Sequence, residues 1–291
     1  MFDICCIGHI TSDRIVTPGS EVYMPGGTAY YFSHAVRNMG LRYLLVTALA
    51  DADKSYVQGL QQLGIELVSL PSRHTVCFEN IYSLDQDHRI QKVSSKADPF
   101  LPEYFSEIHA SVFHLGTLLA DDMPPQLITA LASRAEISLD VQGLLRTVVD
   151  GRVEPADWPG KAGLLPCISY LKANEEEAEV LTGSTDPYKS ARLLAEQGVK
   201  EVILTLGSKG SLVYSNGVFH TIPAYPPVSV VDATGCGDTY MAGYLAQRKR
   251  GAGISEAGRF AAAMATIKIQ SSGPFSAPVA EAEKWLHGTT P

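Results

Sequence analysis

The sequence lacks the features that mark several classes of protein. Its five cysteines are an odd number, none forms a CxxC pair, and no zinc-binding spacing occurs. No apolar run reaches the roughly 18 residues that a membrane span needs, and no signal peptide precedes the first apolar segment. Charged residues make up only 19% of the 291 residues, and the net charge is −8. Together these absences predict a reduced, cytoplasmic, globular protein that does not bind nucleic acid or membranes.

Two common nucleotide-binding motifs are also missing. No GxxxxGK[ST] segment occurs, and no GxGxxG follows the first predicted strand. The chain is therefore neither a P-loop protein nor a dinucleotide-binding protein of the Rossmann type. If it binds a nucleotide, it must do so by another route.

Short apolar segments alternate with helical patterns along the chain. Asn174 is predicted to cap one helix and Gly183 to end it. Strands joined by helices require crossover connections, which predicts a mainly parallel sheet covered on both faces. Apolar residues make up 45% of the chain, enough for a sizeable core. The strands are predicted at residues 3–8, 42–48, 111–115, 137–141, 168–172 and 201–206, and the helices at residues 28–39, 55–63, 125–134, 175–181, 190–197, 238–247 and 254–269.

Two regions depart from this alternation. Residues 10–24 carry no helical signal, and residues 73–95 read as a β-ribbon with a turn near residues 85–87. A β-rich insertion of this kind is either a lid over a site or an edge hairpin. A second hairpin is predicted at residues 211–222, where Asn216-Gly217 is typical of a type I′ turn.

The segment VSVVDATGCGDTYMAGYL, residues 228–245, carries the strongest chemical signal. It predicts a strand ending at Val231, a glycine-rich turn, and a helix that begins at Asp238. Backbone amides of the glycines and the helix N-terminus would cradle an anion, and Asp238 could take a proton from an attacking hydroxyl. The alternative is that Asp238 only caps the helix. A nucleophilic Cys236 is a weaker hypothesis, since no histidine lies nearby in the sequence to activate it.

The stretch DATGCGDTYMAG resembles the DTxGAGDxFxAG signature of the ribokinase-like (PfkB) carbohydrate kinases, and further matches follow in order from residue 3 to about residue 276. The resemblance implies one three-layer α/β/α domain over residues 1–291, with a mainly parallel central sheet. The small β-rich lid would come from about residues 10–24 and 73–95. Ala233 and Cys236 depart from the usual signature. By resemblance Asp238 is the catalytic base, and the anion hole is formed by the amides of Gly235, Cys236 and Gly237.

The resemblance also implies ATP as the phosphoryl donor, with Mg²⁺ and, as in many members, a monovalent cation such as K⁺. Glu177 of the KANEEE segment would hold Mg²⁺ through water, although an acidic first turn of a helix is the simpler interpretation. Lys209 would reach a phosphate or lie in solvent. The implied nucleotide-binding residues are Asn174, Thr205, Gly207, Lys209, Gly210, Ala261 and Met264. The implied monovalent-cation residues are Asp232, Thr234, Gly273 and Ser276.

Matches in the N-terminal half imply the acceptor site. Asp13 would accept hydrogen bonds from two neighbouring hydroxyls, although it could equally be a turn residue. Tyr31 stands where the family often has an asparagine that contacts the sugar, so the pocket should differ from that of a ribose or fructose kinase. Arg146 would meet an anion or form a structural ion pair. The implied substrate-binding residues are Asp13, Gly26, Gly27, Tyr31, Asp140, Gln142 and Arg146.

Three functions remain open from the sequence. The first is a kinase that transfers the γ-phosphoryl group of ATP to a hydroxyl of a small sugar, polyol or cyclitol such as an inositol. The second is a nucleoside kinase of the same fold. The third is a non-catalytic nucleotide or sugar sensor, which the intact Asp238 motif disfavours. A homodimer that pairs through the lid is a further expectation from the resemblance.

Overall fold

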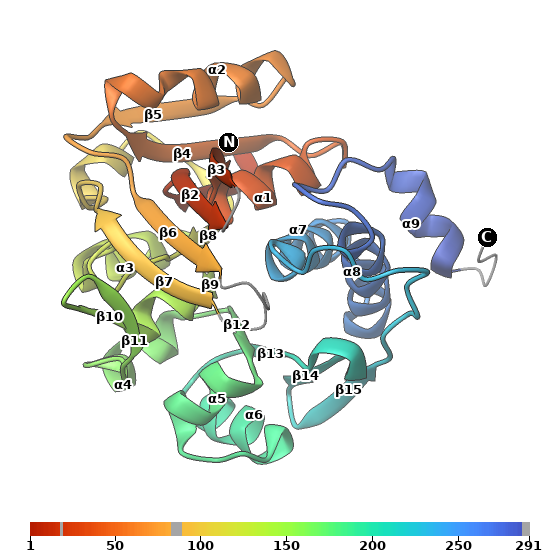
Figure 1. The fold of residues 1–291 in the computed structure, drawn as a ribbon. Coiled ribbons are helices and arrows are strands. Elements are labelled where there is room, and N and C mark those ends of the chain that lie inside the picture. Colours follow the sequence, from red (N-terminus) through yellow and green to blue (C-terminus); the bar gives the residue numbers. More distant parts are fainter. Residues whose placement is uncertain (18–19, 83–88, 287–291) are drawn as a thin grey trace.

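Two β-sheets organise the chain in the computed structural model, which describes residues 1–17, 20–82 and 89–286 (Figure 1). The larger sheet has the order β15-β14-β13-β12-β9-β8-β1-β4-β5, and every pair from β13 to β5 is parallel. The predicted mainly parallel sheet is therefore confirmed. Its strands are β1 (Phe2–Gly8), β4 (Tyr43–Leu49), β5 (Leu67–Pro71), β8 (Ala110–Gly116), β9 (Glu136–Asp140), β12 (Tyr170–Asn174), β13 (Glu201–Thr205), β14 (Ser211–Ser215) and β15 (Val218–Ile222).

Helices cover both faces of this sheet, as three-layer packing requires. Strand β1 shows why: Ile4 and Cys6 point into one buried cluster with α1, α7 and α8, while Cys5 and Ile7 point into the other with α3, α5 and α6. None of the helices within the described ranges is long and apolar enough to cross a bilayer. The helices are α1 (Thr28–Val36), α2 (Lys54–Gln62), α3 (Pro125–Ala132), α4 (Lys161–Leu164), α5 (Glu175–Thr182), α6 (Pro187–Glu196), α7 (Cys236–Lys249), α8 (Ile254–Ile269) and α9 (Val279–Leu286). Short 3₁₀ turns lie at η1 (Asp51–Asp53), η2 (Pro102–Phe105), η3 (Gln142–Leu145), η4 (Leu165–Cys167) and η5 (Gly207–Lys209).

The second sheet is the β-rich lid, with the strand order β10-β11-β7-β6-β2-β3. It packs on a small apolar cluster that contains Phe78 and Leu118. The predicted ribbon is present, but its turn lies outside the described residues. The β10–β11 hairpin was missed, although Asp150-Gly151, both at positive φ, is a type I′ signal. The lid strands are β2 (Thr11–Thr17), β3 (Ser20–Gly26), β6 (Cys77–Tyr82), β7 (Arg89–Ser95), β10 (Arg146–Val149) and β11 (Arg152–Pro155).

Local sequence signals succeeded at turns and caps. Asn216 and Gly217 have φ of 50° and 80°, as a type I′ turn requires. Asn174 caps α5 within a reciprocal capping box, and Gly183 ends the helix in a left-handed conformation.

The predicted strand ending at Val231 is wrong. Its segment is an irregular loop fixed to α8, because the amides of Val231 and Asp232 both donate to the carbonyl of Ile269. Helix α7 also begins two residues earlier than predicted, at Cys236.

Candidate active site

The glycine turn before α7 is locked by its neighbours. Gly235 precedes the helix at φ 75°, and a Cβ there would lie 2.2 Å from the ring carbon Cδ1 of Tyr31. Glycine is therefore required both for the backbone conformation and for the space. The amide of Thr234 donates to Asp232 Oδ1 at 2.9 Å, and that of Cys236 donates to the carbonyl of Ala233 at 3.2 Å. The backbone amide of Cys236 is thus already hydrogen-bonded within the turn. The amides around Gly237, at the N-terminus of α7, are therefore better placed to donate to an anion than the predicted amide of Cys236.

Asp238 is the third residue of α7 and is only partly exposed. Burial raises the pKa of its carboxyl to about 7, and the charge of Asp140 adds to this rise. The ammonium of Lys172 and a hydrogen bond with Thr28 oppose it. A carboxylate whose pKa lies near neutrality is well matched to accept a proton from a hydroxyl.

Lys172 is a buried cation next to this carboxylate. Its Nζ lies 3.1 Å from Asp140 Oδ2 and 3.8 Å from Glu177 Oε2. A Cβ on Gly237 would lie 3.3 Å from the same Nζ, so the lysine reaches the helix N-terminus. Burial opposes the charged lysine, but the carboxylates of Asp140 and Glu177 prevail and raise its pKa above the usual value.

Asp140, a predicted substrate ligand, is paired in the structure with a group of the protein, and its contact with a substrate stays a prediction. Its side chain is 4% exposed and is the counter-ion of Lys172. It also accepts a hydrogen bond from the amide of Gln142 at 3.2 Å. Both oxygens are directed to groups of the protein, because a buried ammonium requires a paired charge.

Three of the predicted acceptor residues, Asp13, Gly26 and Tyr31, lie where the lid strands β2 and β3 meet α1. A Cβ on Gly26 would lie 2.7 Å from Asp13 Oδ2 and 2.8 Å from Thr11 Oγ1, so the side chains of Asp13 and Thr11 both lie against Gly26. The charges of Asp232, Asp13 and Asp238 all act on the Tyr31 phenol, whose pKa is raised first by burial and then by them. The lid carboxylate and the predicted base therefore lie around the same ring.

The other predicted acceptor residues lie in three different parts of the structure. Gly27 has φ 85°, and a Cβ there would lie 2.5 Å from the carbonyl of His9, so it is required by the backbone. Gln142 begins the turn η3, beside Asp140. Arg146 begins β10 of the lid. Burial raises the pKa of Glu177 above its usual value, and the positive charge of Arg146 is one of the groups that oppose this rise. Their contact with a substrate stays a prediction.

The Asn174–Glu177 pair offers oxygen atoms of the kind that Mg²⁺ prefers. Asn174 Oδ1 accepts the Glu177 amide, and Glu177 Oε2 accepts the Asn174 amide, both at 2.8 Å. Across the described residues no group of three or more His, Cys, Asp or Glu could hold a metal ion directly. The donor set fits Mg²⁺ bound through water and substrate phosphates rather than in a protein cage.

Most of the predicted nucleotide-binding residues lie in one of two places, around the loop after β13 or on helix α8. Thr205, at the end of β13, and Gly207, in η5, lie in the loop region beside α5. Lys209 pairs with Glu175 at 3.0 Å, and its side chain is 71% exposed. A Cβ on Gly210 would lie 2.0 Å from the carbonyl of Ile222, so this glycine is needed where β14 meets β15.

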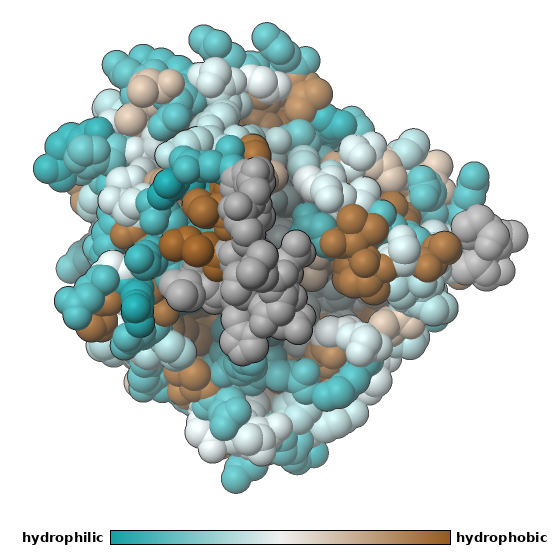
Figure 2. All heavy atoms as spheres, viewed as in Figure 1, coloured by the Kyte–Doolittle hydropathy of each residue, from teal (hydrophilic) through white to brown (hydrophobic). Residues whose placement is uncertain are grey.

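The prediction that two residues of α8 contact the nucleotide is not supported by their burial. Ala261 and Met264 are 0% exposed and face α7, where Met264 Sδ approaches Gly243. They have no surface to offer a nucleotide in this conformation. The apolar surface next to the turn comes instead from Val228, Val230 and Val231, which are 84%, 71% and 55% exposed. Figure 2 shows apolar surface over the region where Figure 1 draws α7, α8 and this loop.

The Cys236 thiol is not set up as a nucleophile. It lies 3.8 Å from the carbonyl of Ala265, to which it donates. Burial raises its pKa to about 11, and only the Lys268 ammonium opposes this among the groups that act on it most strongly. A thiol with this pKa is protonated at neutral pH.

The oxygens of Asp232, which were predicted to bind a monovalent cation, are hydrogen-bonded to a lysine ammonium. The ammonium of Lys268 bonds to the backbone and side-chain oxygens of Asp232 and to the carbonyl of Ser271. Thr234 belongs to the same turn, and Gly273 and Ser276 follow Ser271 in the chain. A fixed positive charge thus already occupies the oxygens of Asp232, so the residues present do not fit an added monovalent cation there.

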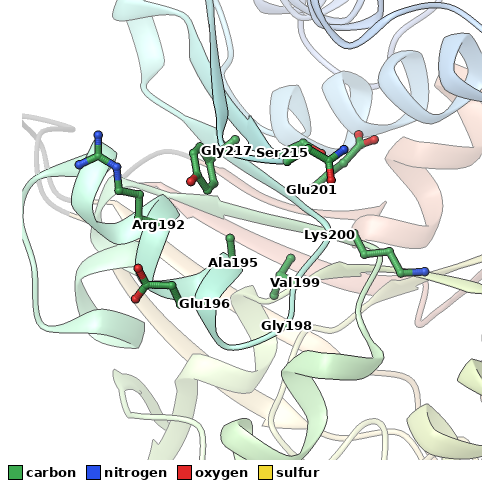
Figure 3. A pocket seen from close by; sticks show the side chains of 11 residues that line it. Arg192, Ala195, Glu196, Gly198, Val199, Lys200, Glu201, Ser215 and Gly217 are labelled. Carbon is green, nitrogen blue, oxygen red and sulfur yellow. The ribbon is translucent and has the colours of Figure 1, made fainter.

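A surface cavity of about 540 Å³ lies elsewhere, between α6, β13 and β14 (Figure 3). Glu201 and Ser215 line it, at the ends of β13 and β14 opposite to Thr205. Ligands of parallel sheets bind beyond the carboxyl ends of the strands. This cavity is therefore at the wrong end of the sheet to be the active site.

Sequence reasoning assigned no role to Thr28, Lys172 or Lys268. Thr28 follows the Gly26-Gly27 pair directly, which was a usable signal. Lys172 is the first residue of the KANEEE segment, but its partner Asp140 is 32 residues away. Lys268 looks like an ordinary basic residue in the last turn of a helix.

Comparisons with known proteins agree with this geometry. The family model "pfkB family carbohydrate kinase" matches residues 1–280. Cytidine kinase of Thermococcus kodakarensis is 30% identical over 96% of this chain and 100% of its own length. Inositol 3-kinase of Arabidopsis thaliana is 25% identical over 93% of this chain and 74% of its own. A solved pyrophosphate-dependent kinase of the ribokinase family, complexed with a pyrophosphate analogue and myo-inositol, is 29% identical over 96% of this chain and 99% of its own, with a TM-score of 0.87.

A parallel sheet with a β-lid and a carboxylate at a glycine-capped helix N-terminus defines a phosphotransferase that uses an alcohol group as its acceptor. The chain belongs to the PfkB family of carbohydrate kinases, and it is a sugar or nucleoside kinase with the ribokinase-like fold.

Proposed function

We propose that the protein transfers the γ-phosphoryl group of ATP to one hydroxyl of a small polyol or cyclitol of the inositol kind, with Asp238 as the base. The observation that carries this proposal is the position of Asp238, whose pKa of about 7 lets it take a proton near neutral pH. The solved relative that binds myo-inositol and the inositol 3-kinase support the acceptor class.

The acceptor would lie between the lid and α1. Asp13, with Thr11 next to it, would accept hydrogen bonds from neighbouring hydroxyls. The reacting hydroxyl would then face Asp238, with the Tyr31 ring near both carboxylates. A carboxylate that binds two hydroxyls favours a ring or chain with a vicinal diol.

The donor would lie along the N-terminus of α7. Amides at this end and the helix dipole stabilise the charge that builds on the transferred group. Mg²⁺, when bound, would neutralise phosphate charge, with Asn174 and Glu177 orienting its water ligands. The exposed Val228, Val230 and Val231 offer an apolar surface for a nucleobase, which favours ATP over pyrophosphate as the donor.

A nucleoside acceptor is the second candidate, because the cytidine kinase aligns with almost the whole chain. A screen of phosphoryl transfer separates the candidates. Inositols, other polyols, sugars and nucleosides would each be tested with ATP–Mg²⁺ and with pyrophosphate–Mg²⁺, and the product would be identified by mass.

We expect the highest kcat/KM with a cyclitol and ATP. A preference for cytidine or another nucleoside would replace the proposed acceptor. A preference for pyrophosphate would replace the proposed donor. Donor hydrolysis or transfer with any acceptor would exclude the non-catalytic sensor.

A further inference from the structure

The ammonium of Lys268 is enclosed by oxygen atoms in the way that a bound monovalent cation would be. Its Nζ donates to the carbonyl of Asp232 at 2.8 Å, to Asp232 Oδ2 at 3.1 Å and to the carbonyl of Ser271 at 3.4 Å. An ammonium has three N–H donors, so these three oxygens satisfy it fully. Its side chain is 0% exposed, which keeps water away from the charge.

These oxygens belong to the segment that positions the glycine turn. Asp232 Oδ1 accepts the amide of Thr234 at 2.9 Å, one residue before Gly235. The amides of Val231 and Asp232 bind the carbonyl of Ile269, next to Lys268 on α8. The ammonium therefore ties the start of the turn to the end of α8.

The opposite charges of Asp232 and Lys268 keep the start of the turn joined to α8 near neutral pH. Burial opposes the ionised form of Asp232, yet the hydrogen bonds from Thr234 and Lys268 hold the pKa of Asp232 below its usual value. A second cation on the same oxygens would lie beside the ammonium, where like charges repel strongly at low dielectric. One fixed positive charge is thus sufficient, and it leaves no place for another.

We propose that Lys268 replaces a bound monovalent cation as the positioning group of the anion-binding turn, so that phosphoryl transfer by this protein does not require K⁺ or Na⁺. The proposal rests on the proposed kinase function. Because the ammonium is covalently attached to α8, it has no binding equilibrium, and the turn keeps its shape at any salt composition. Lys268 acts through Asp232 and the turn and does not itself contact the substrate.

The first test measures wild-type turnover with the best donor–acceptor pair in tetramethylammonium chloride. Tetramethylammonium would then be exchanged for K⁺, Na⁺ or NH₄⁺ at constant ionic strength. We expect kcat/KM to change by less than about twofold, because the ammonium is already in place. A stimulation of tenfold or more by K⁺ would overturn the proposal. Inactivity with every donor and acceptor in every salt would instead count against the proposed function.

The second test uses Lys268→Met, with Lys189→Met on the exposed face of α6 as the matched control. In tetramethylammonium the Lys268 variant should lose at least about tenfold in kcat/KM, as expected when a positioning charge is removed. K⁺ or NH₄⁺ should restore part of this activity and should raise its melting temperature specifically. The control should show neither response.

The melting temperature is a readout that does not depend on activity. Wild type should melt at the same temperature in K⁺ and in tetramethylammonium. A folded Lys268→Met that keeps full activity, or that gains no cation response in either measurement, would contradict the proposal. If this variant does not fold, the wild-type comparison alone decides the question.

Discussion

Two buried lysines lie at the two ends of the turn from Asp232 to Gly237, and they have different partners. Lys268 is bound mainly by carbonyl oxygens and one carboxylate at the start of the turn. Lys172 lies under Gly237 at the other end, between the carboxylates of Asp140 and Glu177. The first lysine fixes the position of the backbone. The second adjusts the proton affinity of the base.

The largest effect expected among variants of the turn itself is that of Gly235→Ala. The new Cβ would clash with the Tyr31 ring, and the alanine would have an unfavourable positive φ. Loss of the anion-binding geometry should lower kcat by roughly 10²-fold or more. Gly251→Ala, at the other end of α7, is the control, because Gly251 also has positive φ but open space around it. Equal losses in both variants would show that backbone strain, rather than the turn, controls activity.

Lys172→Met should have the next largest effect. The Lys172 charge lowers the pKa of Asp238, so its removal should raise that pKa from about 7 to a higher value. The acid limb of kcat/KM should move to higher pH, where each pH unit of movement lowers the rate at neutral pH by roughly tenfold, and activity should recover at alkaline pH. A pH–rate profile measures this. An acid limb that stays in place would remove Lys172 from its tuning role.

A second substitution sharpens that test. Asp140 raises the pKa of Asp238, so Asp140→Asn in the Lys172→Met background should move the acid limb back towards neutral pH. It also removes the carboxylate that would otherwise lose its partner in the interior. A further movement to higher pH in the double variant would contradict the assigned signs.

The smallest effect is expected for Tyr31→Phe. The ring, which packs on Gly235, is retained, and only the hydroxyl is removed. Turnover should fall by less than roughly tenfold, as for loss of one hydrogen bond. Tyr31→Asn removes the ring itself and should change the order of preferred acceptors in the same panel. An unchanged order would mean that Tyr31 does not shape the acceptor pocket.

The sequence allowed prediction of features that depend on near neighbours in the chain. The parallel sheet, the Asn216-Gly217 turn, the capping of α5 and the glycine turn before α7 all follow from local patterns. The two lysines could not be assigned in this way. Lys172 and Lys268 gain their roles from Asp140 and Asp232, which lie 32 and 36 residues away, and from the burial of each pair.

The contacts that the sequence did not indicate have the same physical origin. Ala261 and Met264 were expected at the nucleotide, but the packing of α7 on α8 buries them. Asp140, expected at the substrate, is the counter-ion of the buried Lys172 ammonium, and its contact with a substrate stays a prediction. In both cases tertiary contacts, which a matching motif does not reveal, decide what surrounds the side chain.

The most direct test of the kinase assignment is Asp238→Asn, compared with wild type for turnover, donor binding and thermal stability. We expect kcat to fall by about 10²- to 10⁴-fold, since the base is lost, while the donor Kd stays the same. The raised folded-state pKa means that ionised Asp238 costs stability as the pH rises from about 4 to about 7, so the variant should melt at the same or a higher temperature at pH 8. Near wild-type turnover in a folded Asp238→Asn protein would contradict the account.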